Sequence, residues 1–268
     1  MLLGEEKQHF QRGLRRSAQG PIIGQMSIER RNFPQFFITA ASPCPYLPGR
    51  QERKVFTHLV GPDSRHLNTQ LSQSGFRRSQ NIAYRPACDR CSACVSMRVP
   101  VKSFDWRRSF RRVLKDNSDV RSEVKAAKAT SEQYSLFRTY IDHRHSEGGM
   151  ADMTVLDFAA MVDDTLVDSR VVEYRLPTAY APEGELVAAV LIDLLGDGLS
   201  MIYSYFDPQF SARSLGTYII LDTIQRTERM GLPYTYLGFW VNGSEKMDYK
   251  SKFLPQERLG PDGWQLVR

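Results

Sequence analysis

The cysteines carry the strongest chemical signal in this chain. Cys88, Cys91 and Cys94 are separated from one another by two residues each, and Cys44 is the only other cysteine. Such gaps let thiolates converge on one ion with Cys44 as a fourth ligand, which suits a zinc knuckle or an iron–sulfur site. The alternative is four reduced thiols that pack near one another without a metal. The spacing does not choose between these hypotheses.

Arginines flank the cysteine cluster. Arg77, Arg78 and Arg98, together with Tyr84, stand close to it in the sequence. Guanidinium groups bind carboxylates through two hydrogen bonds at once, so this set could recognise an acidic side chain. A basic surface strip that binds RNA is the competing hypothesis.

A third candidate site lies in the C-terminal half, where a strand runs into the turn Arg213-Ser214-Leu-Gly216 at the start of a helix. The free N–H groups of a helix N-terminus can hold a phosphate. The turn is similar to the pyrophosphate loop of GNAT acyltransferases, except that Thr217-Tyr218 replaces the second glycine. The pyrophosphate of coenzyme A would therefore fit poorly. An ordinary capped helix is the alternative.

A fourth group follows Trp240 and comprises Lys246, Tyr249 and Lys250. Lysines beside a tyrosine can contact phosphate and ribose. The same composition is typical of a solvated loop.

The composition sets the class of protein. The chain has 268 residues, of which 41% are hydrophobic and 25% charged, as in a soluble globular protein. No apolar run approaches the roughly 18 residues of a membrane span. The first 25 residues lack the apolar core of a secretory signal. Four cysteines without an export signal indicate reduced thiols, so we expect a cytoplasmic protein without membrane partners.

Charge is divided unevenly along the chain. Residues 50–125 contain 17 Lys and Arg against 7 Asp and Glu, whereas residues 126–268 contain 13 against 20. A basic half joined to an acidic half favours a polyanionic partner, and nucleic acid is the first candidate.

The hydrophobic pattern predicts elements that position these groups. Short strands are expected near 36–39, 55–60, 81–85 and 95–101, and helices near 67–75, 105–115 and 131–145. Ser103 is expected to cap the second helix, which carries a basic face, and Thr130 with Gln133 to cap the third. A helix at 154–162 and strands at 170–176, 186–195 and 199–206 follow, then a helix at 215–231 and a strand at 234–240. We expect residues 1–25 to be a disordered extension, 26–125 an N-terminal region and 126–268 a C-terminal domain.

Several uncommon segments together resemble the bacterial branch of the arginyl-tRNA–protein transferase family, the aspartate/glutamate leucyltransferases. They are PCPYLPG at 43–49 and the segments 75–99, 140–153, 203–224 and 234–255. The resemblance covers the chain from about Met26 onwards.

The resemblance implies an α+β fold, with a GNAT-like core around a mostly antiparallel sheet and the cysteine-bearing region packed on it. It also implies transfer of leucine, or less favourably arginine, from aminoacyl-tRNA to proteins that begin with Asp or Glu. An adaptor of an ATP-dependent protease would then act on the product, as in N-end rule degradation. The aminoacyl ester is already activated, so the chemistry needs no cofactor. In relatives the cysteines are tied to zinc or iron–sulfur binding.

Under this resemblance each candidate residue receives a role. The acceptor's acidic side chain would be bound by Arg77, Arg78, Tyr84 and Arg98. The aminoacyl-tRNA would be bound by Arg213, Ser214, Gly216, Trp240, Tyr249 and Lys250. Catalytic groups would be Tyr205, Asp207, Tyr218 and Lys246. Possible metal ligands are Cys44, Cys88, Cys91 and Cys94.

Two other functions compete. One is an acetyl-CoA-dependent GNAT N-acetyltransferase, which the missing second glycine and the basic cysteine region disfavour. The other is a non-enzymatic zinc-knuckle protein that binds RNA, which the long acyltransferase-like C-terminal block disfavours.

Overall fold

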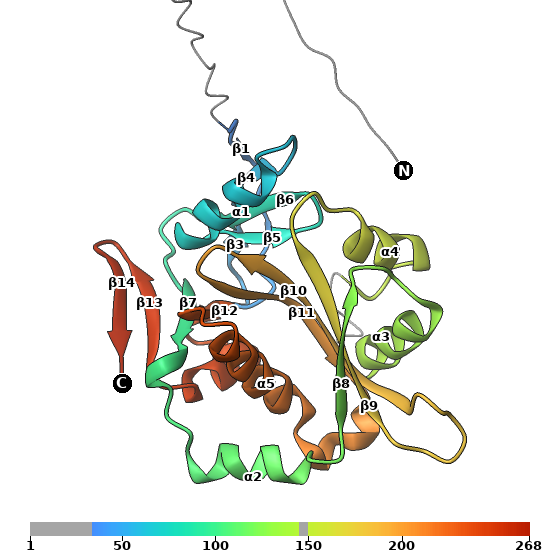
Figure 1. Ribbon diagram of the computed structural model, residues 1–268. Helices are drawn as coiled ribbons and strands as arrows, with labels where there is room; N and C mark the ends of the chain where they lie inside the picture. The colour runs from blue at the N-terminus through green and yellow to red at the C-terminus, as the bar shows by residue number, and fades with distance from the viewer. Residues whose placement is uncertain (1–33, 145–149) are drawn as a thin grey trace, which may run out of the picture. The chain divides into compact units, whose positions relative to one another are not determined.

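An eight-stranded sheet forms the centre of the molecule (Figure 1). The computed structural model describes residues 34–144 and 150–268, so the expectation for residues 1–25 lies outside the described residues. The strand order is β14-β13-β7-β12-β11-β10-β9-β8. Their bounds are β7 Cys94–Pro100, β8 Arg121–Ala126, β9 Ser169–Leu176, β10 Glu185–Leu195, β11 Gly198–Phe206, β12 Tyr234–Val241, β13 Gln256–Gly260 and β14 Gly263–Val267. Only β11 and β12 pair in parallel; the other pairs of this sheet are antiparallel.

The acyltransferase-like core has the predicted order. Strands β9, β10 and β11 form a meander, η2 (Pro208–Arg213) leads into helix α5 (Leu215–Arg229), and β12 returns beside β11. Helix α5 buries Ile219, Leu221 and Ile224 completely against the sheet. The structure thus confirms an α+β fold with a mostly antiparallel sheet and a GNAT-like succession of elements.

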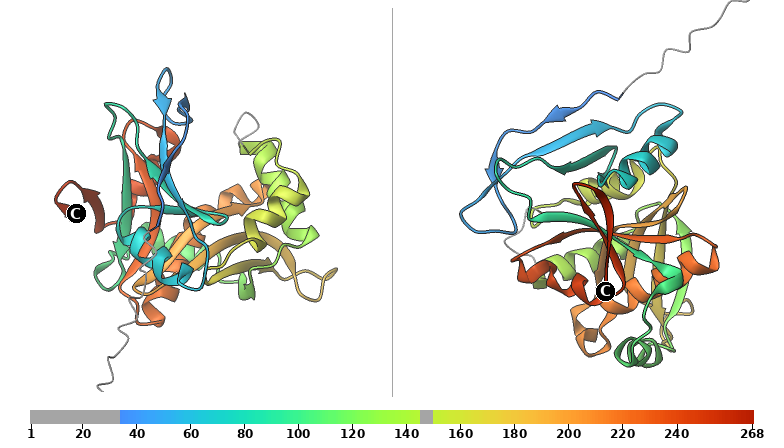
Figure 2. Two further views of the ribbon diagram at one scale, coloured as in Figure 1. Left: turned by 90° about the horizontal axis from the view of Figure 1, so that it is seen from above. Right: turned by 90° about the vertical axis from the view of Figure 1, so that its left-hand side faces the viewer.

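Helices cover both faces of the sheet. Along β10, Val190 and Ile192 pack into the cluster with α5 and α2 (Arg108–Asp116), whereas Ala189 and Leu191 pack against α3 (Ser131–Arg144) and α4 (Val155–Asp163). This alternation follows the two-residue period of a strand, and it explains why β10 is apolar almost throughout. Figures 1 and 2 show α3 and α4 together on one flank. No helix within the two described ranges is both long and apolar enough to cross a membrane.

The cysteine-bearing region builds a second, four-stranded sheet in the order β1-β4-β6-β5. Its elements are β1 Phe37–Ile38, β4 Lys54–His58, α1 Ser64–Gln73, β5 Arg77–Ser79 and β6 Ile82–Pro86, with the small pair β2 Ser42–Pro43 and β3 Gln51–Glu52 beside it. Figure 2 shows this sheet in blue and teal. Strand β7 continues from this region into the large sheet, between β12 and β13. The predicted domain boundary after residue 125 stays a prediction.

Some local predictions fail. Ser103 lies in η1 (Val101–Ser103), and α2 starts at Arg108, with Arg107 at its N-cap and no capping side chain, so the predicted cap is wrong. Thr130 does accept a 3.1 Å hydrogen bond from the Gln133 N–H, as predicted. Strands β8, β13 and β14, and the short helices α6 (Glu245–Asp248) and η3 (Tyr249–Lys252), are not in the prediction.

Candidate active site

The parallel strands β11 and β12 pair only briefly and then separate. Gly198–Ser200 pairs with Tyr234–Tyr236, and no later pairs join the two strands. Beyond that point β12 contains a bulge, because its register with β7 shifts between Tyr236 and Gly238. Gly238 has a φ of +75°, a conformation that glycine adopts most easily. We call the region beyond these pairs the β11–β12 separation.

Arg77 extends from β5 into the β11–β12 separation. Its Nη2 donates a 2.9 Å hydrogen bond to the Ile202 carbonyl of β11. Its side chain also lies directly over Gly238 of β12, where an added Cβ would lie 2.4 Å from the Arg77 Nε. Within the described part of the chain, neither Nε nor Nη1 of Arg77 has a hydrogen-bond partner. Two donors of Arg77 are therefore unused by the described part of the fold.

Lys250 supports the bulge from the other side. Its buried Nζ donates to the carbonyls of Leu237 and Phe239, at 2.8 and 2.7 Å, on either side of Gly238. Burial lowers the pKa of Lys250 well below its usual value, and the Arg77 charge lowers it further. This ammonium is enclosed and its bonds go to the backbone, so the structure gives Lys250 a supporting place in the fold, and its tRNA-binding role stays a prediction.

Four tyrosine side chains lie around Arg77 and α3. Burial raises the pKa of Tyr46 to about 12, although the charge of Arg77 opposes the shift. Burial also raises the pKa of Tyr249, where Tyr140 adds to the effect and Arg77 opposes it. The pKa of Tyr203 is raised by burial and then by Tyr140. These phenols stay protonated at neutral pH, so they can donate hydrogen bonds to a developing oxyanion. Only Tyr249 was predicted from the sequence.

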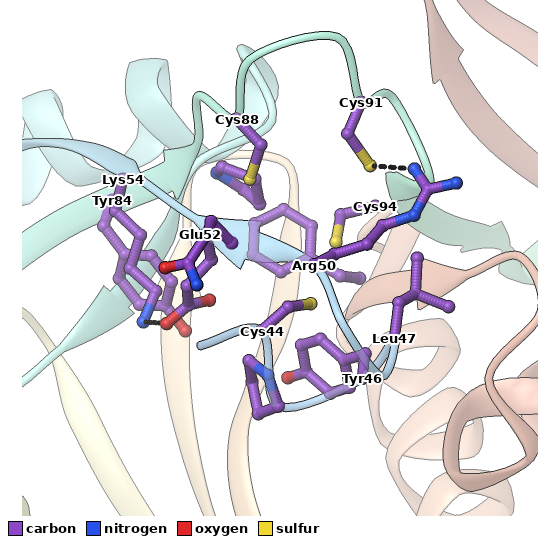
Figure 3. A pocket seen from close by; sticks show the side chains of 14 residues that line it. Cys44, Tyr46, Leu47, Arg50, Glu52, Lys54, Tyr84, Cys88, Cys91 and Cys94 are labelled. Atoms are coloured by element: carbon purple, nitrogen blue, oxygen red, sulfur yellow. Dashed lines mark hydrogen bonds and ion pairs between the residues drawn. The ribbon is translucent and has the colours of Figure 1, made fainter. Parts of the chain in front are cut away.

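The four cysteines line one small cavity of about 50 Å³ together with Tyr46, Tyr84 and Phe239 (Figure 3). Cys44 directly follows β2, Cys88 and Cys91 precede β7, and Cys94 is the first residue of β7. Burial and the nearby thiols raise the pKa of Cys94 from 9.0 to about 11. The structure therefore brings Cys44 into one cavity with the other three cysteines, while its role as a fourth ligand stays a prediction.

A metal requires more than a shared cavity. Sulfur ligands suit zinc or an iron–sulfur cluster. Among residues 34–144 and 150–268, however, no group of three or more His, Cys, Asp or Glu side chains is arranged to hold a metal ion. In this arrangement Cys91 instead accepts a 3.4 Å hydrogen bond from Arg50. The side chains as placed do not form a ligand set, and metal binding stays a prediction.

Arg78 does not lie with Arg77. Its side chain is 1% exposed, and it donates to both carboxylate oxygens of Asp193, at 2.6 and 2.8 Å, and to Ser169. A buried pair of this kind is costly to break, because it would leave one charge unpaired. This arginine joins β5 to β10, and its predicted role in binding the acceptor stays a prediction.

Arg98 also makes its contacts within the fold. Its Nε donates to Glu257 at 2.7 Å, and its guanidinium lies between the rings of Tyr234 and Trp264, at 3.5 and 4.2 Å. These contacts join β7, β12, β13 and β14. Binding of the acceptor's carboxylate by Arg98 stays a prediction.

Two predicted catalytic tyrosines are buried. Tyr205 is 2% exposed and packs edge-on against Phe137, while Tyr218 is 8% exposed and packs against Tyr174. Both phenols thus belong to the core as well as to the predicted site, and their catalytic roles stay predictions. Asp207 is only partly buried and accepts a 2.8 Å hydrogen bond from the Gln209 N–H at the start of η2.

The turn before α5 differs in detail from its prediction. Arg213 binds both oxygens of Asp119, at 2.7 and 2.9 Å, and is thus already neutralised. Ser214 has a φ of +54° and starts the helix. Gly216 lies so close to Phe206 that an added Cβ would lie 2.9 Å from the ring. The turn lies at the exit of β11, as predicted.

The remaining candidate residues lie on or near β12. Trp240 stacks under the Arg258 guanidinium at 3.8 Å, and its buried Nε1 has no hydrogen-bond partner among the described residues. Lys246 is exposed on α6. Tyr84 lies edge-on to Phe239, with 6.1 Å between ring centroids, and so joins the thiol cavity to β12.

Solved structures give only distant likenesses. FemX covers 69% of this chain and 61% of its own, with 12% identity and a TM-score of 0.43. The C-terminal domain of a lysylphosphatidylglycerol synthetase from Agrobacterium fabrum covers 69% and 54%, with 12% identity and a TM-score of 0.38. Likenesses this weak carry no argument about function.

Sequence relatives are much nearer. An aspartate/glutamate leucyltransferase from Bradyrhizobium sp. (strain ORS 278) is 60% identical over 246 residues, which are 90% of this chain and 95% of the relative. One from Afipia carboxidovorans is 61% identical over 243 residues, covering 90% and 96%. Residues 42–112 match the family described as arginine-tRNA-protein transferase, N terminus, and residues 132–260 match its C terminus. The chain belongs to the arginine-tRNA-protein transferase family.

Proposed function

We propose that this protein transfers leucine from leucyl-tRNA to the α-amine of proteins that begin with Asp or Glu. Family membership and relatives of about 60% identity that carry this name support the proposal. The observation that carries the acidic specificity is Arg77, a guanidinium between β11 and β12 with two donors that no described group accepts. A guanidinium in this state recognises a carboxylate and rejects its amide.

The reaction needs alignment more than activation. An α-amine with a pKa near 8 is partly neutral at pH 7, and it attacks the carbonyl carbon of the aminoacyl ester. A C–N bond forms, the C–O bond to the ribose breaks, and the amine's proton passes to the ribose oxygen. The phenols of Tyr46 and Tyr249 are the groups we assign to stabilise the tetrahedral oxyanion. Asp207 and Lys246 remain candidates for moving the proton.

The donor end is assigned to the start of α5 and to β12. The Gly216 N–H in the first turn of α5 and the Ser214 hydroxyl would hold the 3′-terminal nucleotide, since the Ser214 N–H already donates to the Ser211 carbonyl at 3.1 Å. Trp240 and Tyr249 would border its base and ribose. Arg213 takes no direct part in this assignment, because Asp119 already neutralises it.

The thiol cavity is assigned a supporting role. It shares Tyr84 and Phe239 with the surroundings of Arg77, so a zinc ion or cluster there would stabilise the acceptor side. Zinc, iron and sulfide contents of freshly purified protein test this assignment. Leucylated products would pass to a protease adaptor in the cytoplasm.

The deciding experiment offers labelled leucyl-tRNA or arginyl-tRNA to peptides that begin with Asp, Glu, Asn, Lys or Arg. We expect leucine to be transferred to the Asp and Glu peptides alone. Transfer to Lys or Arg, or tight binding of coenzyme A in calorimetry, would overturn the proposal.

A further inference from the structure

Helix α2 displays a row of cations on one side. Arg108 lies three and four residues before Arg111 and Arg112, and Lys115 lies four and three residues after them, so the four share one face of the helix, and all four are exposed. We call these four residues the α2 basic face. The segment 102–121 contains seven Lys and Arg against three Asp and no Glu, so its charge is strongly positive.

The opposite side of α2 is firmly anchored. Phe110 is buried and stacks on Phe253 and Phe104, with ring centroids 5.2 and 5.6 Å apart. Aromatic stacking of this kind fixes both the position and the rotation of a short helix. The basic face is therefore held at one place on the molecule.

Little local charge neutralises this face. Arg112 meets Asp116 at 3.4 Å, but both side chains are exposed, and such pairs contribute little to stability. Arg108 and Lys115 have no carboxylate partner in the described part of the chain. Arg78 and Arg98, by contrast, are spent on buried bonds. Four exposed cations of the basic half therefore stand together on α2.

The face also lies beside the start of α5. Just after α2, Asn117 donates a 2.9 Å hydrogen bond to the Arg213 carbonyl, and Asp119 binds the Arg213 guanidinium. Figure 1 shows α2 below the end of α5 that carries this turn. If the end of a polyanion binds at this turn, the rest of the polyanion would pass along α2.

We propose that the α2 basic face binds phosphates of the donor RNA beyond its 3′-terminal nucleotide. This inference rests on the proposed function and adds a surface for the body of the tRNA. Arginine and lysine on a helix contact phosphates without distinguishing bases, so the face would bind any tRNA body alike. The choice of amino acid and acceptor then falls to the β11–β12 separation.

The test compares the full donor with a minimal one. A double variant, Arg108→Gln with Lys115→Gln, is assayed with leucyl-tRNA and with the leucyl ester of adenosine, which lacks the RNA body. The control variant, Arg65→Gln with Lys128→Gln, removes two exposed cations, one from α1 and one beyond β8. Each phosphate contact contributes about 0.9 to the slope of log affinity against log salt. We therefore expect the slope of the double variant to be shallower by about 2.

Over 50 to 200 mM salt this difference corresponds to a KM for leucyl-tRNA that rises about tenfold more in the wild type than in the double variant. The minimal donor should react equally with wild type, double variant and control. Unchanged KM and slope in the double variant would overturn the inference, as would equal loss with both donors. A wild type that leucylates no peptide would instead refute the proposed function, and uncharged tRNA binding in the same salt series would still test the face.

Discussion

Replacing Gly238 with alanine should disable Arg77 without touching it. The new Cβ would lie 2.4 Å from Nε, 2.5 Å from Cζ and 2.8 Å from Cδ of Arg77. Atoms cannot remain this close, and the flexible arginine will move more easily than the strand. Arg77 should therefore leave the Ile202 carbonyl and withdraw its free donors from the β11–β12 separation.

Gly238→Ala should have two energetic effects, one on the stability of the fold and one on recognition of the acceptor. The first is backbone strain, since a residue with a Cβ at a φ of +75° costs about 1–2 kcal/mol. The second is the lost contact between a guanidinium and the acceptor's carboxylate, worth about 1.5–3 kcal/mol. The second part corresponds to a fall of about 10- to 150-fold in kcat/KM for an Asp peptide. The first part appears only in the free energy of unfolding.

The assay measures kcat/KM for peptides that begin with Asp and with Asn, at saturating leucyl-tRNA. Gly231→Ala is a matched control, because its φ is +70° and an added Cβ there would meet no atom within 4 Å. Both variants should lose similar stability in urea denaturation. Only Gly238→Ala should lose the preference for Asp over Asn, and the KM for leucyl-tRNA should be unchanged in both.

A double variant tests whether Gly238→Ala acts through Arg77. Once Arg77→Ala has removed the guanidinium, Gly238→Ala should have little further effect on selectivity, so the two changes should be strongly non-additive. Additive effects would refute the reasoning. So would a Gly238→Ala protein that keeps the full preference for Asp.

Three further outcomes follow from the buried groups. Asp193→Asn should lower the free energy of unfolding in urea by about 3–5 kcal/mol, because Arg78 stays buried without its counter-charge. Unchanged stability would contradict the role of this ion pair in joining β5 to β10. Lys250→Met should lower the melting temperature, because the carbonyls of Leu237 and Phe239 lose their hydrogen-bond donor, which costs about 1–3 kcal/mol for each carbonyl. An unchanged melting curve would contradict the supporting role of Lys250. Cys94 should react with iodoacetamide at pH 8 about 100-fold more slowly than an ordinary thiol, because its pKa of about 11 leaves little thiolate. Peptide mass spectrometry measures the rate of alkylation, and an ordinary rate would disprove the raised pKa.

The sequence predicted the core elements well where burial imposes a period. Strand β10 and helix α5 each bury a regular set of apolar side chains, so their pattern is visible without the structure. Strand β8 was missed because nearly all of its residues are exposed and no apolar alternation marks it. The C-terminal hairpin was missed because β13 is only half-buried and carries Glu257 and Arg258 on its way through the sheet.

The site was harder to predict, because adjacent residues on a strand point to opposite faces. Arg77 and Arg78 are equivalent as sequence, yet one enters the β11–β12 separation and the other pairs with Asp193, 115 positions away. Nothing local specifies which face is which. A usable signal was Gly238 between aromatic residues of a strand, since such a glycine often marks a bulge or a close approach. It was not used.

Strand β12 explains how one sheet can bind both substrates. In its first half β12 bonds to β11 on one edge and β7 on the other, which joins the acyltransferase-like core to the cysteine-bearing region. In its second half the bulge at Gly238 turns two carbonyls toward Lys250 and leaves Arg77 a path across the strand. The continuous half must stay rigid for the irregular half to keep its geometry. The buried bonds of Arg98 meet this need, because they fix β7, β12 and β13 just before the bulge. In the proposed function, Arg98 would therefore support acceptor recognition through the strand that Arg77 crosses.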